Sequence, residues 1–567
     1  MFESKAKKWC KKPFDVETQK AVSKLFYSPK KLEEAFYKDI EFGTGGIRGI
    51  IGVGTNRINK YTLGRCAQGL SNYLKKRNKK GTIKIVVAYD CRLNSKEWAN
   101  QIAEIFSANG IYCYLFSDLR PTPELSFAVR YLNASCGIVI TASHNPPEYN
   151  GFKVYSKDGG QIVPPEDTDI IKFVNEVDFS EIKFEKNSNL IELIDKKIDQ
   201  QFYKSTIDVA KFDKSLTKNL KIIFTPLHGT SITAIPNVLK MSGFKNVFLV
   251  KEQAVPNGNF PTIKSPNPEE PEAFKLAIKE AKINDGEIII ATDPDGDRIG
   301  VSIKDEDQNF YLLNGNQTMI IIIHFLLEHW KKTDKLNGNQ FIATTIVSTP
   351  MLKKMSAEYN VIFKETLTGF KWISKLIKDF PNLEFIAGGE ESYGYLIGNK
   401  VRDKDAVAVA LLICEIENQM RNIGKSIYEL LVECYKKYGA YKERLISFVK
   451  EGKEGVNEIQ TKMNNLRNFP PKFIAGVPVV QIKDYNKGFS LNPLNESKTK
   501  LNLPKSNVIT FILEDNSKIS VRPSGTEPKI KFYISVNNKF DSNKSWLNQK
   551  KVLEEKIELI KNEFINL

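Results

Sequence analysis

Two patterns of hydrophobic and polar residues alternate along most of the chain. Short apolar runs bounded by turn residues, such as "IKIVVAYD" from residue 83 and "CGIVITA" from residue 136, predict buried strands. Longer amphipathic stretches between them, such as "EWANQIAEIFSANG", predict helices. The alternation returns from residue 220 and again from residue 340. It indicates βαβ units and three α/β domains of comparable plan, with mixed or parallel sheets.

The two ends of the chain depart from this alternation. The first forty residues, with "FDVETQKAVSKLF" and "KKLEEAFYKDI", are polar and helical in pattern and predict an extension packed on the first domain. After about residue 440, the runs "VPVVQIKDY", "NVITFILED" and "KIKFYISV" precede a charged terminal helix. They predict an α+β domain with an antiparallel sheet.

A chain of 567 residues is too long for one hydrophobic core. The predicted fold is therefore α/β, with three consecutive mixed or parallel α/β domains and a C-terminal α+β domain. We place the N-terminal helical extension and domains I to IV, in chain order, at residues 1–40, 41–210, 211–313, 314–440 and 441–567.

Composition narrows the range of partners. The net charge of +16, from 83 basic and 67 acidic residues, is compatible with nucleic acid, an anionic membrane or an anionic small substrate. The lysines are spread over the whole length, without a recognition-helix pattern or an aromatic-basic stripe. A solvated lysine-rich surface is the favoured interpretation, and a phosphorylated small molecule fits equally well.

Cysteine usage and hydropathy indicate the cytoplasm. The seven cysteines are scattered and include no CxxC pair, which is typical of free thiols in a reducing compartment. No apolar run reaches the roughly 18 residues that a membrane span needs, and the N-terminus lacks the apolar core of a signal peptide.

The stretch "VITASHNPPEYNGFKVY", residues 139 to 155, carries the first candidate chemistry. Val139 and Ile140 end a buried strand, and the prolines and glycine that follow break regular structure. Ser143 therefore lies at the carboxyl end of a buried strand, where open α/β sheets bind their ligands. An ordinary serine in a turn is the alternative.

The stretch "EIIIATDPDGDRIG" carries the second. Asp293, Asp295 and Asp297 follow a buried strand at steps of two, and Pro294 and Gly296 exclude a helix, so that alternate side chains can face one way. Three carboxylates with no adjacent lysine repel each other and favour a hard divalent cation. Magnesium is preferred to calcium, because the EF-hand pattern does not fit.

Three further stretches offer polar groups in tight loops. In "FIAGGEESYGYLIG", Glu390 and Ser392 suit sugar hydroxyls, and the two glycines permit close backbone approach. The stretch "FGTGGIRG" fits neither the Walker pattern nor the dinucleotide-binding pattern. The remaining interpretation is a flexible loop that delivers one arginine, Arg48, to an anion. In "VRPSGTEPKIKFY", a tight loop between strands forms a metal-free phosphate cradle from Arg522, Ser524, Gly525 and Thr526.

The stretches around Ser143, Asp293, Glu390 and Arg522, in this order and at these distances, resemble the motifs of the α-D-phosphohexomutase family. The chain looks most like its phosphoglucomutase branch, the subgroup that also includes phosphopentomutases, and the resemblance extends from about residue 40 to 560. It implies four domains around a central cleft. It also implies an isomerase, an intramolecular phosphotransferase, that interconverts glucose 1-phosphate and glucose 6-phosphate through a phosphoserine and glucose 1,6-bisphosphate.

The resemblance also implies a role for each site residue. The phosphoryl group would be carried by Ser143. The ligands of Mg²⁺ would be Ser143, Asp293, Asp295 and Asp297. The sugar would be read by Glu390 and Ser392. The distal phosphate would be clamped by Arg522, Ser524 and Thr526. Through "LTGFKW" and "RDKDAVA", two more residues would line the substrate site: Thr368 and Lys404. The reacting phosphate would be surrounded by Arg48, His144, Lys153 and Arg298.

Serine is a poor nucleophile, so a base must take its proton and a cation must offset the developing charge. Lys153 is the first candidate for the acid/base group and His144 the second. Lys153 requires a depressed pKa, which Mg²⁺ and Arg298 could supply. The alternative, that Lys153 only binds phosphate, stays open.

Several functions compete with the leading interpretation. Phosphopentomutase is the main alternative, because the sugar loop does not settle ring size. Phosphomannomutase and phosphoglucosamine mutase are disfavoured, because "GEESYG" resembles the glucose branch more closely than it resembles theirs. A non-catalytic basic binding protein would leave the Ser143 and aspartate loops as relics, and a phosphatase would not need the cradle at 522–526. The expected partners are phosphorylated sugars, with no nucleic acid and no membrane, for a monomer or dimer.

Overall fold

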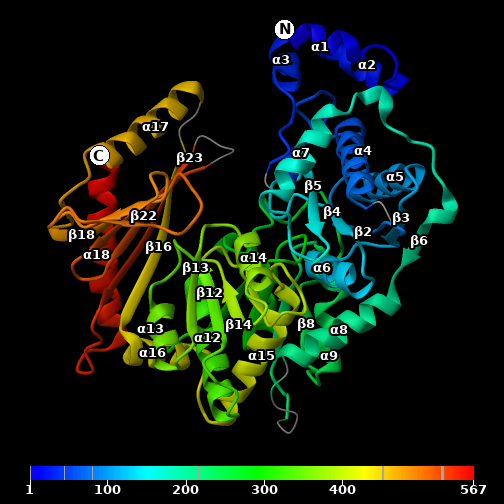
Figure 1. Ribbon diagram of the computed structural model, residues 1–567. Coiled ribbons are helices and arrows are strands. Elements are labelled where there is room, and N and C mark those ends of the chain that lie inside the picture. The colour runs from blue at the N-terminus through cyan, green and yellow to red at the C-terminus, as the bar shows by residue number, and fades with distance from the viewer. Residues whose placement is uncertain are drawn as a thin grey trace. The chain divides into compact units, whose positions relative to one another are not determined.

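Figure 1 shows the computed structural model, which describes residues 2–43, 45–78, 81–210, 212, 217–449, 452–524 and 529–566. Internal packing divides the chain into two compact units. The first unit comprises residues 1–314, 370–381 and 392–423, and the second comprises residues 315–369, 382–391 and 424–567.

The chain opens with three short helices: α1 (Phe2–Trp9), α2 (Val16–Leu25) and α3 (Pro29–Phe36). Their apolar residues gather around Trp9, whose ring stacks on Phe14 at a centroid distance of 4.2 Å. Trp9 also meets the ring of Tyr61 edge-on at 5.8 Å, and Tyr61 belongs to α4 (Lys60–Arg77). The N-terminal helices therefore pack on the domain that follows them.

The first sheet has the strand order β1-β5-β4-β2-β3-β6. Its strands are β1 (Gly46–Ile50), β2 (Lys84–Tyr89), β3 (Tyr112–Phe116), β4 (Cys136–Ile140), β5 (Tyr149–Ser156) and β6 (Ile191–Ile194). β2 pairs in parallel with β3 and β4, whereas β5 pairs antiparallel with β4 and β1. The sheet is therefore mixed.

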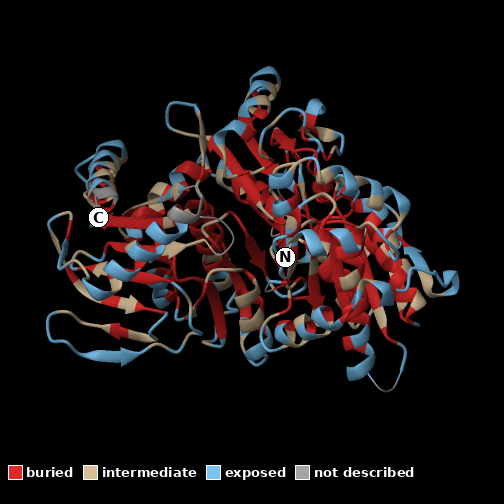
Figure 2. Cartoon of the chain, turned by 90° about the horizontal axis from the view of Figure 1, so that it is seen from above, coloured by how far each residue is buried: buried red, intermediate tan, exposed pale blue. Residues whose placement is uncertain are grey.

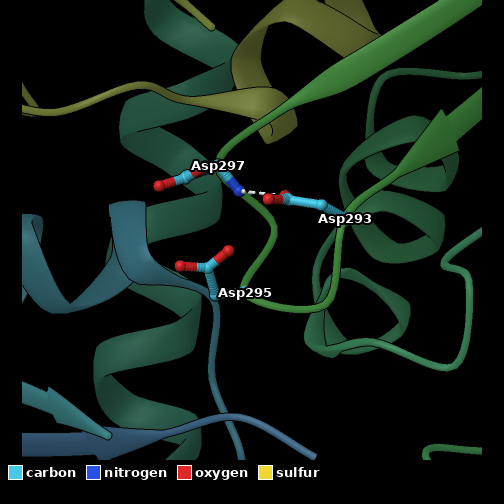
Figure 3. Close-up of side chains that lie close together, drawn as sticks. All are labelled: Asp293, Asp295 and Asp297. Carbon is cyan, nitrogen blue, oxygen red and sulfur yellow. Dashed lines mark hydrogen bonds between the residues drawn. The ribbon is translucent and has the colours of Figure 1, made fainter. Parts of the chain in front are cut away.

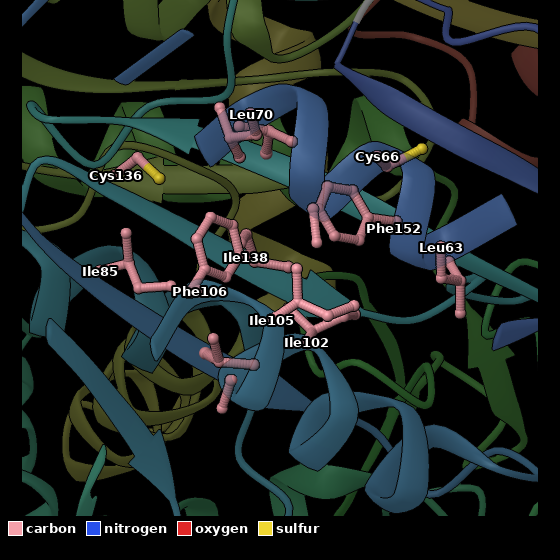
Figure 4. Packing of buried hydrophobic residues seen from close by; sticks show 14 of the residues in the cluster. Leu63, Cys66, Leu70, Ile85, Ile102, Ile105, Phe106, Cys136, Ile138 and Phe152 are labelled. Atoms are coloured by element: carbon pink, nitrogen blue, oxygen red, sulfur yellow. The ribbon is translucent and has the colours of Figure 1, made fainter. Parts of the chain in front are cut away.

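Helices cover both faces of this sheet. α4 and α5 (Ser95–Ala108) pack on one face, where Figure 4 shows Ile138 and Phe152 of the strands among the helix side chains. α6 (Thr122–Tyr131) packs on the other face, to which the next residue of β4, Val139, contributes. Because both faces are covered, the successive residues of the central strand β4 and those of β2 after Lys84 are largely apolar, which is the pattern that predicted these two strands.

The second sheet has the strand order β11-β10-β9-β7-β8. Its strands are β7 (Ile222–Thr225), β8 (Val247–Leu249), β9 (Ile288–Thr292), β10 (Ile299–Lys304) and β11 (Phe310–Leu312). The helices that pack on it or beside it include α8 (Lys196–Ala210), α9 (Ile235–Met241), α11 (Lys275–Asn284) and α15 (Ala406–Asn422). β9 is parallel to β7 and antiparallel to β10, so a tight turn joins β9 to β10.

The second unit begins with a parallel arrangement. β12 (Gln340–Thr345) pairs in parallel with β13 (Ile362–Thr366) and with β14 (Glu384–Gly389). α12 (Gly315–Lys332) packs on β14, and α13 (Met351–Glu358) packs on β13. This segment is the third α/β domain that the sequence predicts.

The C-terminal sheet has the order β16-β23-β22-β21-β18-β19-β20 and is antiparallel throughout the described pairings. Its strands are β16 (Ala440–Val449), β18 (Val477–Asp484), β19 (Phe489–Leu491), β20 (Lys498–Lys500), β21 (Ile509–Leu513), β22 (Lys518–Pro523) and β23 (Lys529–Asn538), and the short β17 (Phe473–Ile474) pairs with β18. Its helices are α17 (Gly452–Asn468) and α18 (Trp546–Asn566).

Figure 2 shows the strands of the sheets largely buried and the outer helix faces exposed. The predicted fold class, three α/β domains with mixed or parallel sheets and a C-terminal domain with an antiparallel sheet, is confirmed. The domain boundaries given above stay predictions.

Candidate active site

Ser143 lies three residues beyond β4, in the turn that leads to β5, and is only 3% exposed. Its backbone has a φ of +53°, and its N–H donates to Thr141 Oγ1 over 2.8 Å. For a residue other than glycine this left-handed conformation costs about 1–2 kcal/mol, so neighbouring contacts must maintain it. The structure thus places Ser143 at the carboxyl end of a buried strand, as predicted, and adds a constrained backbone.

The turn between β9 and β10 carries the three aspartates. Asp293, Asp295 and Asp297 are buried, and one oxygen from each lies within 4.8 Å of the others. Figure 3 shows the three side chains around this turn. Asp293 Oδ1 accepts hydrogen bonds from the N–H of Asp297, at 3.1 Å, and of Arg298, at 2.9 Å. Gly296, at a φ of +65°, permits the tight turn that brings the carboxylates together.

The electrostatics of this cluster favour a cation. Burial raises the pKa of Asp293, and the charges of Asp295 and Asp297 raise that pKa further. The Oδ1 atoms of Asp295 and Asp297 accept no hydrogen bond from the described part of the chain. Buried carboxylate oxygens without donors are costly, and oxygen ligands of this kind suit a hard divalent ion. The donor set therefore fits Mg²⁺.

The nucleophile and the aspartates meet directly. Ser143 Oγ donates to Asp293 Oδ2 over 2.7 Å, which joins the turn after β4 to the turn after β9. His144 Nδ1 lies 3.2 Å from the same Oγ. Burial lowers the pKa of His144, and the charges of Arg298 and Arg48 lower it further, so that the imidazole is neutral. A neutral ring nitrogen beside a serine hydroxyl is able to accept its proton.

Two lysines from distant parts of the chain reach the aspartates, although none is adjacent to them in the sequence. Lys153 Nζ, on β5, lies 2.6 Å from Asp295 Oδ2 and 3.5 Å from Asp297 Oδ2, and Lys404 Nζ lies 3.0 Å from Asp297 Oδ2. Burial lowers the pKa of Lys153, but the carboxylates of Asp295 and Asp297 outweigh burial and the pKa is raised. Without a cation at the aspartates, their pairing with the lysine thus acts against the depressed pKa that an acid/base role requires, and a depression caused by Mg²⁺ stays a prediction.

Arg48 lies on a strand rather than in the flexible loop that the sequence suggested. The antiparallel pairing of β1 with β5 sets Arg48 opposite Gly151. Arg48 Nη1 donates to Asn145 Oδ1 over 3.0 Å, which brings the guanidinium to the turn of the nucleophile. Arg298 Nη1 pairs with Glu269 Oε1 at 2.6 Å.

Lys404 packs against Gly394 on its way to the aspartate cluster. Ser392 lies in the turn that precedes β15 (Tyr395–Ile397), and Gly394 lies between them. A Cβ at Gly394 would lie 2.1 Å from Lys404 Cδ, so the lysine side chain packs directly against this glycine and would have to shift if residue 394 carried a Cβ. Lys404 Nζ also lies 3.1 Å from Asp403 Oδ1.

In the second unit, Glu390 directly follows β14. Its Oε1 accepts a hydrogen bond of 2.9 Å from the N–H of Gly369, the residue after Thr368, so these two predicted sugar-site residues lie in adjoining turns. The role of Gly388 differs from the prediction. A Cβ there would lie 2.4 Å from Ala343 O on β12, so this glycine allows two strands to pack closely rather than admitting a sugar.

Arg522 lies within β22, where it is paired with Lys531 of β23, rather than in the loop itself. The loop begins at Ser524, whose N–H donates to the carbonyl of Lys529 over 2.7 Å. Two further predicted members of this loop lie outside the described residues: Gly525 and Thr526.

Sequence reasoning missed residues that support the site from outside. The N–H groups of Thr122 and Thr230 donate over 2.8 Å to the carbonyls of Asp295 and Pro294, which fixes the turn of the aspartates. Arg92 donates to carbonyl oxygens in the turn after β4. All three follow the end of a strand, which is the signal that singled out Ser143, but a threonine or an arginine in such a turn is common.

Three models of one family match the chain, described as Phosphoglucomutase/phosphomannomutase, alpha/beta/alpha domains I, II and III. They match residues 39–181, 200–306 and 314–438. In the part of the chain that the structure describes, no helix is long and apolar enough to cross a membrane.

Individual proteins are similar over nearly the whole length. A phosphoglucomutase of Staphylococcus haemolyticus is 39% identical over 509 residues, which cover 89% of this chain and 92% of that protein. A phosphoglucomutase of Staphylococcus aureus is 36% identical over 536 residues, 93% of this chain and 95% of that protein. The crystal structure of a putative phosphomannomutase from Thermus thermophilus has the same fold, with a TM-score of 0.70 at 20% identity over 94% of this chain and 100% of that one.

Proposed function

Because the chain belongs to the α-D-phosphohexomutase family, in its phosphoglucomutase branch, we propose that it interconverts glucose 1-phosphate and glucose 6-phosphate. Members of this family are Mg²⁺-dependent isomerases that act on phosphorylated sugars. The observation that carries the proposal is the hydrogen bond of 2.7 Å from Ser143 Oγ to Asp293, within a buried cluster of three carboxylates. That arrangement sets a nucleophile beside a candidate metal site.

The reaction consists of two phosphoryl transfers. In the first, the P–Oγ bond of phosphorylated Ser143 breaks and Oγ takes up a proton. A bond from phosphorus to the oxygen of the free sugar hydroxyl forms, and the hydroxyl proton passes to a base. The product, glucose 1,6-bisphosphate, then turns round in the site. In the second transfer, Ser143 Oγ gives its proton to a base and takes the other phosphoryl group, and the sugar oxygen that loses this group takes up a proton.

Mg²⁺ would be held by Ser143, Asp293, Asp295 and Asp297. When bound, it would offset the negative charge that develops on the oxygens around phosphorus. The two acid/base candidates differ in protonation state. The neutral imidazole of His144 lies 3.2 Å from Ser143 Oγ and fits proton acceptance, whereas the pKa of Lys153 is raised by its carboxylate partners, which fits proton donation.

The remaining predicted residues serve the substrate in this proposal. The sugar is read by Glu390 and Ser392, and Thr368 and Lys404 also line the substrate site. The distal phosphate is bound by Arg522, Ser524, Gly525 and Thr526, and the reacting phosphate by Arg48 and Arg298. A cytoplasmic location is also proposed, supported by seven cysteines that are all free thiols.

The test combines a mass measurement with turnover. The wild-type protein, incubated with Mg²⁺ and glucose 1,6-bisphosphate, should gain the mass of one phosphoryl group on Ser143. Ser143→Ala should not gain it and should lose several orders of magnitude in kcat. Ser135→Ala, at the opposite end of β4, is the matched control and should behave as wild type.

Substrate choice is measured in the same preparation. We expect kcat/KM to be highest for glucose 1-phosphate when it is compared with the 1-phosphates of mannose, glucosamine and ribose. A higher value for ribose 1-phosphate would make the protein a phosphopentomutase. Failure of wild type to turn over any of the four, with Ser143 unphosphorylated, would refute the proposal.

A further inference from the structure

Arg92 lies in the turn after β2 and is only 3% exposed. Its guanidinium donates to the carbonyls of Ser143 at 2.7 Å, Pro146 at 2.8 Å and Tyr149 at 2.9 Å, and also contacts the carbonyl of Asn145. Three of these acceptors lie in the turn between β4 and β5 that carries the nucleophile, and the fourth, Tyr149, is the first residue of β5. One buried side chain therefore ties the beginning, the middle and the end of this turn together.

The guanidinium is itself held from two sides. Asp90 Oδ2 lies 3.4 Å from Arg92 Nε, and Asp90 Oδ1 accepts a hydrogen bond of 2.9 Å from the backbone N–H of Arg92, which fixes this carboxylate beside the arginine. The ring of Phe260, from the second sheet domain, lies 5.1 Å from the guanidinium carbon. Gly258 allows this approach, since a Cβ there would lie 2.6 Å from Leu93 N. The position of Arg92 is thus set by the domain of the nucleophile and by the domain of the aspartates.

We propose that Arg92 is a positioning residue for phosphoryl transfer, which holds Ser143 in its left-handed conformation and directs Oγ toward Asp293. This inference rests on the proposed function. Hydrogen bonds from a charged donor are stronger than neutral ones, and several of them stabilise a conformation that Ser143 would not otherwise adopt. Within the described part of the chain, Arg92 contacts the carbonyls of this segment, Asp90 and Phe260, so it acts through the turn.

Arg65 offers a matched control in the same sheet domain. Its guanidinium donates to the carbonyls of Val174 at 3.1 Å, Asn175 at 2.9 Å and Val177 at 3.0 Å, and to Asp39 Oδ2 at 3.2 Å. It also lies 5.5 Å from a phenylalanine ring. Arg65 therefore has the same kinds of partner as Arg92, but the carbonyls that it binds belong to a segment that carries none of the proposed catalytic residues.

The experiment compares Arg92→Lys, Arg92→Ala and Arg65→Lys with wild type. The measured quantities are the single-turnover rate of phosphoryl transfer from glucose 1,6-bisphosphate to Ser143, kcat, KM, the Kd of Mg²⁺ by calorimetry, and thermal unfolding. Misplacement of a reacting group by about 1 Å costs on the order of 100-fold in rate. We therefore expect Arg92→Lys to lose roughly 10- to 100-fold in transfer rate and kcat, with KM and the Kd of Mg²⁺ within about threefold of wild type.

Chemical rescue adds a readout that general destabilisation would not move. Millimolar guanidinium should restore part of the activity of Arg92→Ala, whereas methylammonium, which lacks the planar fork, should not. Arg65→Lys should keep wild-type rates.

Folded Arg92→Lys with a wild-type transfer rate would overturn the proposal. So would equal losses of kcat, substrate affinity and Mg²⁺ affinity, or failure of both Arg92 variants to fold while Arg65→Lys folds, because each would show a general structural role. If Arg92→Ala alone fails to fold, the kcat and KM of Arg92→Lys decide. A wild type that never acquires phosphate on Ser143 would instead refute the proposed function.

Discussion

Substitution of Gly229 by alanine should disturb the metal site without touching a ligand. Gly229 lies at the start of a helical turn after β7, and the next residue, Thr230, donates from its N–H and its Oγ1 to Pro294 O, at 2.8 and 3.0 Å. A Cβ on Gly229 would lie 2.5 Å from Pro294 Cα and 2.7 Å from Pro294 O. The φ of Gly229 is −97°, which any residue adopts, so the substitution adds a collision and no backbone strain.

The size of the effect follows from these distances. Ordinary contacts of a Cβ begin at 3.4 Å, so the turn around Pro294 must move by about 0.9 Å from its present 2.5 Å. Asp293 and Asp295 flank Pro294 and must move with it. A shift of about 1 Å costs on the order of 100-fold in rate, and overpacking costs roughly 1–3 kcal/mol of stability. We expect kcat/KM to fall about 100-fold and Mg²⁺ to bind at least ~10-fold more weakly.

The assay combines calorimetric Mg²⁺ titration, steady-state kinetics and thermal unfolding. Gly424→Ala is the control, because Gly424 has a φ of +72° and its Cβ would meet nothing within 4 Å. That variant should lose about 1–2 kcal/mol of unfolding free energy through backbone strain, while its Mg²⁺ affinity and activity stay at the wild-type level. Stability loss and metal-site distortion are thereby separated.

The reasoning is refuted if Gly229→Ala folds and binds Mg²⁺ within twofold of wild type. It is also refuted if Gly424→Ala shows the same loss of Mg²⁺ affinity, since the effect would then track stability alone.

Three further substitutions test the proposed roles. Asp295→Asn removes one carboxylate charge and the partner of Lys153, so Mg²⁺ should bind at least ~10-fold more weakly by calorimetry and phosphoryl transfer should collapse. Full activity of the wild-type protein after exhaustive chelation would exclude the metal role. Glu390→Gln should change the ranking of sugars in kcat/KM more than the affinity for inorganic phosphate, and an unchanged ranking would move sugar reading elsewhere. Arg522→Ala should raise KM and lower kcat, with partial recovery in Arg522→Lys, which lacks the bidentate fork; wild-type kinetics in the alanine variant would remove Arg522 from phosphate binding.

The fold class could be predicted because each sheet imposes a local pattern on its strands. β4 and β9 are covered on both faces, so all their residues are buried and nearly all are apolar, and this pattern needs no knowledge of distant neighbours. The place of Ser143 and of the aspartates followed from the same logic, because strands end where side chains become free to serve a ligand. The convergence of Asp293, Asp295 and Asp297 also depends only on local spacing, and the structure does bring their carboxylates together.

Contacts between distant segments could not be predicted in this way. The pairing of Lys153 and Lys404 with the aspartates depends on the register of β5 and on the space left by Gly394, neither of which is encoded near the lysines. The same holds for Arg48, which is fixed by strand pairing rather than carried on a flexible loop.

The local pattern of apolar, polar and turn residues thus determined the order of strands and helices, the fold class and the residues with reactive chemistry. Only the tertiary structure decided which charges neutralise each other and which groups hold the reactive turns. Arg92 shows the reason, since an arginine in a turn has no evident role until folding brings four carbonyls of the segment from Ser143 to Tyr149 around it. Hydrogen-bond partners are chosen by geometry across the whole fold, and that geometry exists only after the sheets have packed.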